Sequence, residues 1–451
     1  MSAKENLWAK RFEDVLAIDE IKRRADRPAR PLLCLEKDTI EHACFRIESE
    51  LREVFVTTSR AAEILQKFIE HAYSHSLSRY SDVPKFLGQC YDGLADIEPY
   101  FPHILTGPAG TGKTQLGQAL IRILPPASTI QPDTYHPAIP LIAVRHVAIK
   151  TTKSLPGVLQ TLVRSAHTSG VSGSRSAASI DACARWQYIC GTSLLIADEL
   201  QFISQSSNAS TRIAQVLLGL SYLLVPTLFI GNYSLIHRLR KRPQEERQRL
   251  LGMPLILLLP DLPSSADWAS VVKEYQCAVP GVYQFDFVEK RHELWSLCAG
   301  LKREFIKLLI VTYRRCRRDG KTLVCWEDIE SSYRSPDFFD QRTDVEELIA
   351  QSIDGTKGRD DLRCPIPTNL SLENEYLQAL KDIRSQNLAE AVMRDAMTKA
   401  ERMAAKREQV APPSPSMHQP KRQAISQGRV KKLSVKDLQE NAARHRSQPP
   451  K

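Results

Sequence analysis

The stretch His103-Ile-Leu-Thr-Gly-Pro-Ala-Gly-Thr-Gly-Lys-Thr114 decides the fold of this 451-residue chain. It starts with an apolar run, continues into a glycine-rich loop of the form G-x-x-x-x-G-K-[ST], and is followed by an amphipathic segment over residues 115–123. A strand, such a loop and a helix in this order predict a phosphate-binding loop, in which backbone N–H groups converge on a polyphosphate. Glycine is needed there because a Cβ would keep the main chain away from the phosphates.

The loop residues are predicted to hold the phosphates of a nucleotide: Gly107, Pro108, Ala109, Gly110, Thr111, Gly112, Lys113 and Thr114. In such loops the lysine reaches the β- and γ-phosphates and the final hydroxyl ligates Mg²⁺. We therefore expect ATP and Mg²⁺ as cofactors, with Lys113 on the phosphates and Thr114 on the metal. A glycine-rich turn with an incidental lysine is the competing interpretation, and the surrounding strand and helix pattern disfavours it.

Short apolar runs recur at residues 104–107, 139–144, 193–199, 227–232 and 254–260. Runs of this length and apolarity suit parallel strands that are covered on both faces. The pattern predicts an α/β fold with a five-stranded parallel sheet sandwiched between helices.

Polar side chains follow two of these runs. Asp198 and Glu199 end one run, and Asn232 follows another. Paired with the phosphate loop, Asp198 is predicted to hold Mg²⁺ through water, and Glu199 to orient and activate the attacking water. Asn232 would lie beside the γ-phosphate. The alternatives are two solvated carboxylates at a strand end and an asparagine in an ordinary turn.

A basic stretch precedes the last run and contains Arg238, Arg240, Lys241, Arg242, Arg247 and Arg249. One of these arginines could complete a neighbouring subunit's site by neutralising transition-state charge, and position favours Arg247 or Arg249. The alternative is a solvated helical face, because Glu245 and Glu246 interrupt the stretch. Arg303, near the start of a later helix, is a candidate cation over the nucleotide, with a surface arginine as the alternative.

The net charge of +10 belongs to the end of the chain. Residues 399–451 contain 13 Lys and Arg against 4 Asp and Glu, a net charge of +9, which leaves +1 for the first 398 residues. The Pro- and Ser-rich text after Val410 is not expected to fold alone. This tail would act as a tether to a partner, with general electrostatic affinity for DNA as the competing explanation.

Compartment signals point to a cytoplasmic protein. The ten cysteines are scattered without a C-x-x-C pair, which indicates reduced thiols rather than a zinc or disulfide framework. The first residues lack the apolar run of a signal peptide. The uncharged stretch at residues 213–230 is better explained by a buried helix and a buried strand, with Pro226 between them, than by a membrane span.

The chain divides into five predicted parts. They are a helical N-terminal region (residues 1–95), a nucleotide-binding core (96–264), a helical lid (265–355), a helical extension (356–409) and a basic disordered tail (410–451).

Taken in order, the phosphate loop, the acidic pair, Asn232, the arginines and the helical lid resemble the AAA+ ATPases over about 230 residues. The resemblance implies a P-loop AAA+ sheet, with Asn232 as the sensor-1 and Arg303 as the sensor-2 residue. Within these ATPases the sequence is most similar to TnsC/TniB-type transposition regulators. That similarity covers roughly residues 50–335 and rests on the loop, Asp198-Glu-Leu-Gln201, Pro226-Thr-Leu-Phe-Ile-Gly-Asn232, Trp268 and Tyr275-Gln276.

The resemblance implies ATP-dependent self-assembly into a ring or helical filament on duplex DNA, linkage of a target-selection protein to the transposase, and disassembly on hydrolysis. It implies DNA contacts after the second strand, where the chain has Lys150, Thr151, Thr152 and Lys153. Such contacts hold phosphates without reading sequence. The C-terminal tail would dock the transposase. The arginines before the last strand outnumber those of the family pattern. No single one is therefore assigned as the arginine finger, the residue that would complete a neighbouring subunit's site.

Two other functions stay open. A helicase loader or replication-initiator-like ATPase would need a partner helicase and often a winged helix after the lid, and residues 340–400 show no clear winged-helix pattern. A defence-signalling ATPase would carry a repeat sensor or an effector domain, and neither is evident. A basic cluster at Lys22, Arg23, Arg24, Arg27 and Arg30 either touches DNA or a partner or is simply solvated.

Overall fold

The computed structural model describes residues 6–80, 82–92, 98–131, 138–149, 154–164, 179–199, 209–354, 359–366 and 371–397. The predicted DNA-contacting residues 150–153 and the tail from residue 410 lie outside this part of the chain. Two compact units are present, Met1–Ala389 and Glu390–Lys451. The sheet, the lid and the candidate site belong to the first unit.

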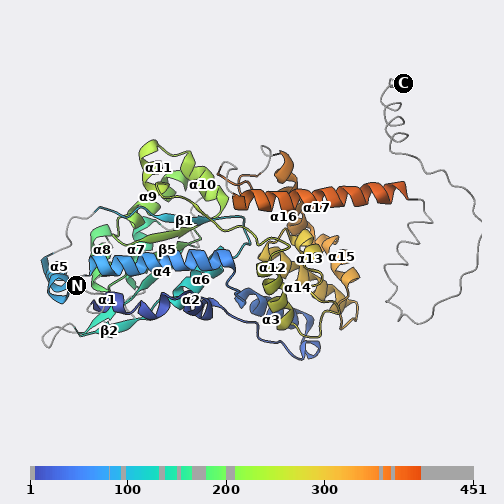
Figure 1. Cartoon of the computed structure of the whole chain (residues 1–451), viewed down its shortest axis with the longest axis horizontal. Coiled ribbons are helices and arrows are strands. Elements are labelled where there is room, and N and C mark those ends of the chain that lie inside the picture. The colour runs from blue at the N-terminus through green and yellow to red at the C-terminus, as the bar shows by residue number, and fades with distance from the viewer. Residues whose placement is uncertain are drawn as a thin grey trace, which may run out of the picture. The chain divides into compact units, whose positions relative to one another are not determined.

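A parallel sheet of five strands forms the centre of the fold (Figure 1). Its order is β4-β5-β6-β1-β7, with β1 (His103–Thr106), β4 (Val144–Ala148), β5 (Leu194–Asp198), β6 (Thr227–Ile230) and β7 (Ile256–Leu257). Leu105 of β1 pairs with Ile230 on one side and Ile256 on the other. The predicted fold class is confirmed. Since parallel strands end at one edge, the loops after β1, β5 and β6 meet there.

Two strands differ from the sequence expectation. The apolar run at residues 139–144 is not the second core strand, because β3 (Ile139–Leu141) pairs antiparallel with β2 (Ser128–Ile130) in a separate sheet. The core strand β4 starts only at Val144 and includes Arg145. It lies at the edge of the sheet, where β5 is its one partner among the described strands, so it does not need the continuous apolar run of a central strand. The run at residues 254–260 contributes only the two residues of β7.

Helices cover both faces of the sheet, and the alternating side chains of each strand divide between two cores. One core joins the strands to α2 (Ile18–Ala25), α4 (Ser59–Arg79) and α6 (Lys113–Ile123). The other joins them to α7 (Leu155–Arg164), α8 (Ile180–Ile189), α9 (Ala209–Ser221), α10 (Tyr233–Arg240) and α11 (Gln244–Leu250). Ile196 of β5 belongs to the first core and Ala197 to the second.

Helix α4 is capped by the residue that precedes Ser59. Ser59 is the first helical residue, and the N-cap is Thr58, whose hydroxyl accepts the Ala61 N–H at 3.4 Å. Two shorter N-terminal helices, α1 (Leu7–Lys10) and α5 (Val83–Asp92), lie near a small aromatic cluster built on Trp8 and Tyr80. In the described part of the chain no helix is long and apolar enough to cross a membrane. The uncharged stretch at residues 213–230 forms the end of α9 and β6, as expected.

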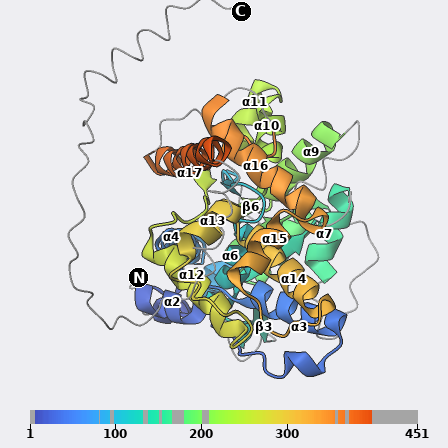
Figure 2. The same cartoon turned by 90° about the vertical axis from the view of Figure 1, so that its right-hand side faces the viewer.

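A second helical body, here called the lid, follows the sheet (Figures 1 and 2). It contains α12 (Ala266–Ala278), α13 (Arg291–Cys298), α14 (Lys302–Arg318), α15 (Trp326–Tyr333) and α16 (Phe339–Asp354). Helix α3 (Ile40–Glu53) from the N-terminal region packs against α14 and shares the core of the lid. The described residues of the N-terminal region are thus divided between the sheet and the lid. The five-part domain division of the sequence stays a prediction.

The lid core explains two positions that carried the family resemblance. Trp268 is fully buried, and its indole N–H donates to the Arg291 carbonyl at 2.9 Å. The Gln276 amide donates to the Phe285 carbonyl at 3.1 Å and accepts the Phe287 N–H at 3.0 Å. Helix α17 (Ser371–Ala396) follows, within the predicted helical extension over residues 356–409.

Candidate nucleotide-binding site

The loop after β1 has a backbone that only glycine permits at three positions. Gly110 and Gly112 have φ of +88° and +97°, in the left-handed region that side chains disfavour. At Gly107 the constraint is space, because a Cβ would lie 2.1 Å from the carbonyl oxygen of Leu258. The Thr111 hydroxyl donates to the Pro108 carbonyl at 3.1 Å and closes the turn. Helix α6 starts at Lys113, so its first N–H groups face the loop.

Lys113 lies inside the loop. Its side chain is buried, and Nζ donates to the carbonyls of Gly107 at 2.9 Å and Pro108 at 2.7 Å. Its pKa is lowered to about 7, mainly by burial and also by the Arg303 charge, while the carboxylates of Asp198 and Glu199 oppose both effects. The ammonium is therefore held by weak neutral acceptors, which a phosphate oxygen could replace.

The acidic pair stands where β5 ends. Asp198 is buried, and its Oδ1 accepts the backbone N–H of Glu199 at 2.7 Å. Glu199 has φ of +63°, a left-handed conformation that costs a non-glycine residue about 1 kcal/mol. Such strain concentrates at functional sites, where it directs side chains. Here the strained residue lines the cavity described next.

A cavity of about 540 Å³ lies between the phosphate loop and the lid, a size within the range of small-molecule sites. The predicted residues that line it are Ala109, Gly110, Gly112, Lys113, Thr114, Glu199, Asn232 and Arg303. The structure thus brings together residues that lie almost 200 positions apart in the chain. Asn232 is the N-cap of α10, yet its amide makes no capping hydrogen bond to that helix.

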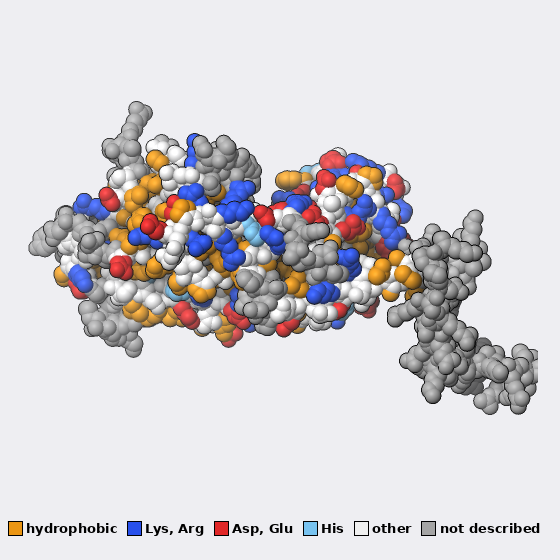
Figure 3. Space-filling model, turned by 90° about the horizontal axis from the view of Figure 1, so that it is seen from above, with side chains coloured by type: hydrophobic (Ala, Val, Ile, Leu, Met, Phe, Trp, Pro, Cys, Tyr) orange, Lys and Arg blue, Asp and Glu red, His pale blue; other side chains and the backbone are white. Residues whose placement is uncertain are grey.

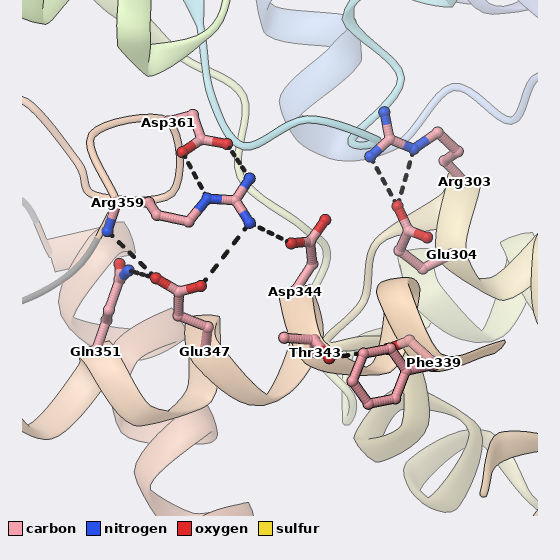
Figure 4. Close-up of polar contacts among 9 residues, drawn as sticks. All are labelled: Arg303, Glu304, Phe339, Thr343, Asp344, Glu347, Gln351, Arg359 and Asp361. Atoms are coloured by element: carbon pink, nitrogen blue, oxygen red, sulfur yellow. Dashed lines mark hydrogen bonds and ion pairs between the residues drawn. The ribbon is translucent and has the colours of Figure 1, made fainter. Parts of the chain in front are cut away.

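The lid is attached to the loop through α14. The Arg303 backbone N–H donates to the Gly110 carbonyl at 3.2 Å. The Arg303 guanidinium donates to the Glu304 carboxylate, with Nε and Nη2 both 2.8 Å from Oε1 (Figure 4). Glu304 is buried whereas the Arg303 side chain is 56% exposed. The guanidinium is therefore within reach of an anion in the cavity, in competition with a neighbouring carboxylate.

Several cavity residues were missed from the sequence. They are Glu48 and Arg52 of α3, Gln115 of α6, Lys302, Glu304, Ile306, Lys307 and Ile310 of α14, and Gln341 of α16. Ile306, Lys307 and Ile310 could have been found from Arg303, because positions three, four and seven residues away share one helical face. No sequence signal points to Arg52, since its place at the cavity depends on how α3 packs against the helices of the lid.

The two candidate finger arginines do not line this cavity. Arg247 and Arg249 are exposed on α11, and the Arg249 guanidinium lies 5.3 Å from the ring centroid of Tyr222 and donates to its hydroxyl. Arg242 is paired with Glu246 at 2.8 Å. Lys and Arg side chains are frequent on the surface around α10 and α11, with acidic side chains among them (Figure 3). A finger acts in a neighbouring subunit, so this assignment stays a prediction.

The strand order, the loop after β1 and the lid over the cavity define an α/β fold of the P-loop class with a helical lid. No family model and no curated protein matches the chain.

Similar solved structures exist. The ORC2 protein of Aeropyrum pernix in ADPNP and ADP complexes is 14% identical over 67% of this chain and 84% of its own, with a TM-score of 0.37. Cdc6p of Pyrobaculum aerophilum is 15% identical over 63% of this chain and 74% of its own, with a TM-score of 0.36. The FIGL-1 AAA domain is 14% identical over 63% of this chain and 85% of its own, with a TM-score of 0.35. Likeness of this degree carries no conclusion about activity, substrate or partner.

Proposed function

We propose that this chain is an AAA+ ATPase that binds ATP with Mg²⁺ in the 540 Å³ cavity and hydrolyses it. One observation carries the proposal. The same cavity is lined by the phosphate loop, the carboxylate of Glu199, the amide of Asn232 and the lysine Lys113. Phosphoryl transfer to water requires this combination of phosphate cradle, cation and water-positioning groups.

The residues of the loop would act first. On nucleotide binding the Lys113 ammonium leaves the carbonyls of Gly107 and Pro108 for the β- and γ-phosphates. Its pKa, lowered by burial, returns toward the ordinary value because the phosphates are anionic. The exposed hydroxyl of Thr114 and the buried carboxylate of Asp198 are the hard oxygen donors that Mg²⁺ prefers. Bound there, Mg²⁺ would neutralise charge that develops on the phosphates.

Glu199 and Asn232 would handle the attacking water. The carboxylate accepts its proton and the amide holds it in line beside the γ-phosphate. Arg303 would exchange Glu304 for the γ-phosphate and so draw the lid onto the nucleotide. Arg247 or Arg249 of a neighbouring copy would complete the site, which makes self-assembly part of the catalytic cycle.

The finer function is regulation of DNA transposition, and the sequence resemblance supports it. In this proposal the chain assembles on duplex DNA through Lys150, Thr151, Thr152 and Lys153, links a target-selection protein to the transposase, and leaves the DNA after hydrolysis. The tail from Val410 recruits the transposase. The near-neutral first 398 residues imply that DNA affinity comes from local basic groups repeated in an assembly.

Two variants test the ATP switch. Lys113→Ala should abolish ATP-dependent binding to duplex DNA, whereas Glu199→Gln should bind DNA with ATP and fail to release it. Lys290→Ala removes a lysine whose partner Glu293 lies 2.9 Å away and outside the cavity, so it should behave as wild type. Equal DNA binding by all variants without nucleotide would contradict the switch.

The partner is tested separately. The purified protein is immobilised on a column and tested for retention of a DDE transposase encoded beside it. Retention that requires residues 410–451 would support a role in transposition. Retention of a replicative helicase instead would favour a helicase loader. Truncation at Val410 should leave ATP hydrolysis unchanged, and its loss would contradict the separate role of the tail.

A further inference from the structure

Lys302 lies between the phosphate loop and the segment that joins the sheet to the lid. Its Cδ is 3.8 Å from the position that a Cβ on Gly112 would take. Its Nζ is 3.5 Å from Oδ2 of Asp261, in the segment after β7. The two side chains are only 17% and 11% exposed. The ammonium is thus the closest cation to a buried carboxylate and, through its aliphatic stem, a neighbour of the loop.

This ion pair separates two cavities. Lys302 lines the nucleotide cavity. Asp261 lines a second cavity of about 450 Å³, which is also lined by apolar side chains of the segment around β7, including Leu257 and Leu259. Asp261 also holds the lid, because its carbonyl accepts the indole N–H of the buried Trp295 of α13 at 2.7 Å. A change at Lys302 is therefore transmitted to the connection between sheet and lid.

The Lys302 ammonium has one charge and two candidate anions. Only two bonds separate Nζ from the Cδ that lies over Gly112, so a rotation of the side-chain end moves the charge from Asp261 toward the loop. A polyphosphate held there carries several negative charges against the single charge of Asp261, and attraction grows with charge at equal distance. Since few waters reach either group, screening is weak and the competition is effective.

We propose that Lys302 is a phosphate-binding residue that exchanges Asp261 for the bound nucleotide, and that this exchange loosens the sheet-to-lid connection at Asp261. The inference rests on the nucleotide site proposed above and adds the way in which occupancy is sensed. Arg303 and Lys302 then differ in role, because Arg303 is paired within its own helix with Glu304, whereas Lys302 is paired across the sheet-to-lid connection.

The surroundings of Asp261 make its partner necessary. Burial raises the pKa of this carboxyl, and the Lys302 charge is the strongest opposing influence. The Thr58 hydroxyl also lowers the pKa, whereas the carboxylate of Asp267 raises it. When Lys302 departs, Asp261 is left buried near another acid, a state that favours rearrangement of the segment it belongs to.

A thermodynamic cycle tests the exchange. The probe is a non-hydrolysed ATP analogue with Mg²⁺, titrated into the full chain by calorimetry. Asp261→Asn should bind it about 5- to 10-fold more tightly, since Lys302 no longer has to leave an ionic partner whose strength is on the order of 1 kcal/mol. Lys302→Met should bind it about 10-fold more weakly. In the Lys302→Met background, Asp261→Asn should have no further effect on affinity.

Several outcomes would overturn the exchange. One is that Asp261→Asn binds the ATP analogue as tightly as the wild type or more weakly. Another is that Asp261→Asn changes the affinity equally in the wild-type and Lys302→Met backgrounds. Asp267→Asn is the matched control, because its carboxylate lines the same second cavity and accepts the Ser59 N–H at 3.0 Å, and among the described residues no ion pair joins it to a lysine. If Asp261→Asn does not fold, Asp261→Ser provides the same comparison.

A fluorescence readout separates sensing from a structural role. Nucleotide should change the emission of Trp295 in the wild type and not in Lys302→Met, and Trp295→Phe identifies the signal. A change that persists in Lys302→Met would overturn the proposal. Failure of the nucleotide site itself would appear differently, as undiminished analogue binding by Lys113→Ala.

Discussion

Replacement of Gly107 by alanine tests the close approach between the phosphate loop and the sheet edge. The new Cβ would lie 2.1 Å from the carbonyl oxygen of Leu258 and 3.1 Å from its carbonyl carbon. Real Cβ atoms essentially never come within 3.0 Å of a heavy atom outside their own residue and its chain neighbours, so one of the two backbone segments must move by about 0.9 Å. The obstacle is main chain, which cannot rotate away as a side chain would.

The cost follows from what that movement disturbs. The Leu258 N–H donates to the Thr106 carbonyl at 2.9 Å, and this bond holds the end of the two-residue strand β7 to β1. Overpacking costs about 1–3 kcal/mol and a lost hydrogen bond about 1 kcal/mol, so the free energy of unfolding should fall by about 2–4 kcal/mol. A shift of the loop by nearly 1 Å should also weaken nucleotide binding, because the backbone N–H groups would no longer converge on the phosphates.

Urea denaturation measures the first effect, and titration with a fluorescent ATP analogue measures the second. Gly88→Ala is the matched control, because a Cβ there meets nothing within 4 Å and Gly88 lies inside α5. Alanine inside a helix is favoured over glycine by about 0.5–1 kcal/mol, so this variant should be slightly more stable and bind as wild type. Wild-type stability together with wild-type affinity in Gly107→Ala would refute the reasoning.

Three further predictions concern stability. Without nucleotide, the pKa of Lys113 is about 7, compared with 10.5 for an ordinary lysine. Between these pH values the unfolded state binds more protons than the folded state, so the free energy of unfolding rises with pH. Lys113→Met should flatten this rise in urea titrations at pH 7 and 9, and an unchanged rise would contradict the burial of the ammonium. Glu199→Gly should be about 1 kcal/mol more stable than Glu199→Ala, because residue 199 has φ of +63°. Thermal unfolding of the two variants measures the difference, and an alanine variant as stable as the glycine variant would contradict the prediction. Gly300→Ala should lower the free energy of unfolding by about 1–3 kcal/mol more than Gly320→Ala does. Both glycines have positive φ, but only an alanine at position 300 would place its Cβ 2.5 Å from Trp295 Nε1. Equal losses of stability by calorimetry would argue against that contact.

Secondary structure followed from sequence where the signal was local. The loop from Gly107 to Thr114 and the end of the strand at Asp198 were predictable because each depends on contiguous residues and on short-range backbone geometry. Strand β4 was misplaced for the opposite reason. Its edge position reduces the need for an apolar run, and the more apolar residues 139–144 belong partly to the separate antiparallel pair of β2 and β3.

The sequence by itself determined the sheet class, the phosphate loop and the residues that could bind a nucleotide. It could do so because the glycine spacing and the carboxylates at a strand end each depend on residues that are adjacent in the chain. Only the tertiary structure decided that α3 joins the lid, that Arg52 reaches the cavity and that Lys302 is paired with Asp261. These contacts join segments 40 to more than 250 residues apart in the chain. Such contacts depend on how whole helices pack, which no local periodicity records.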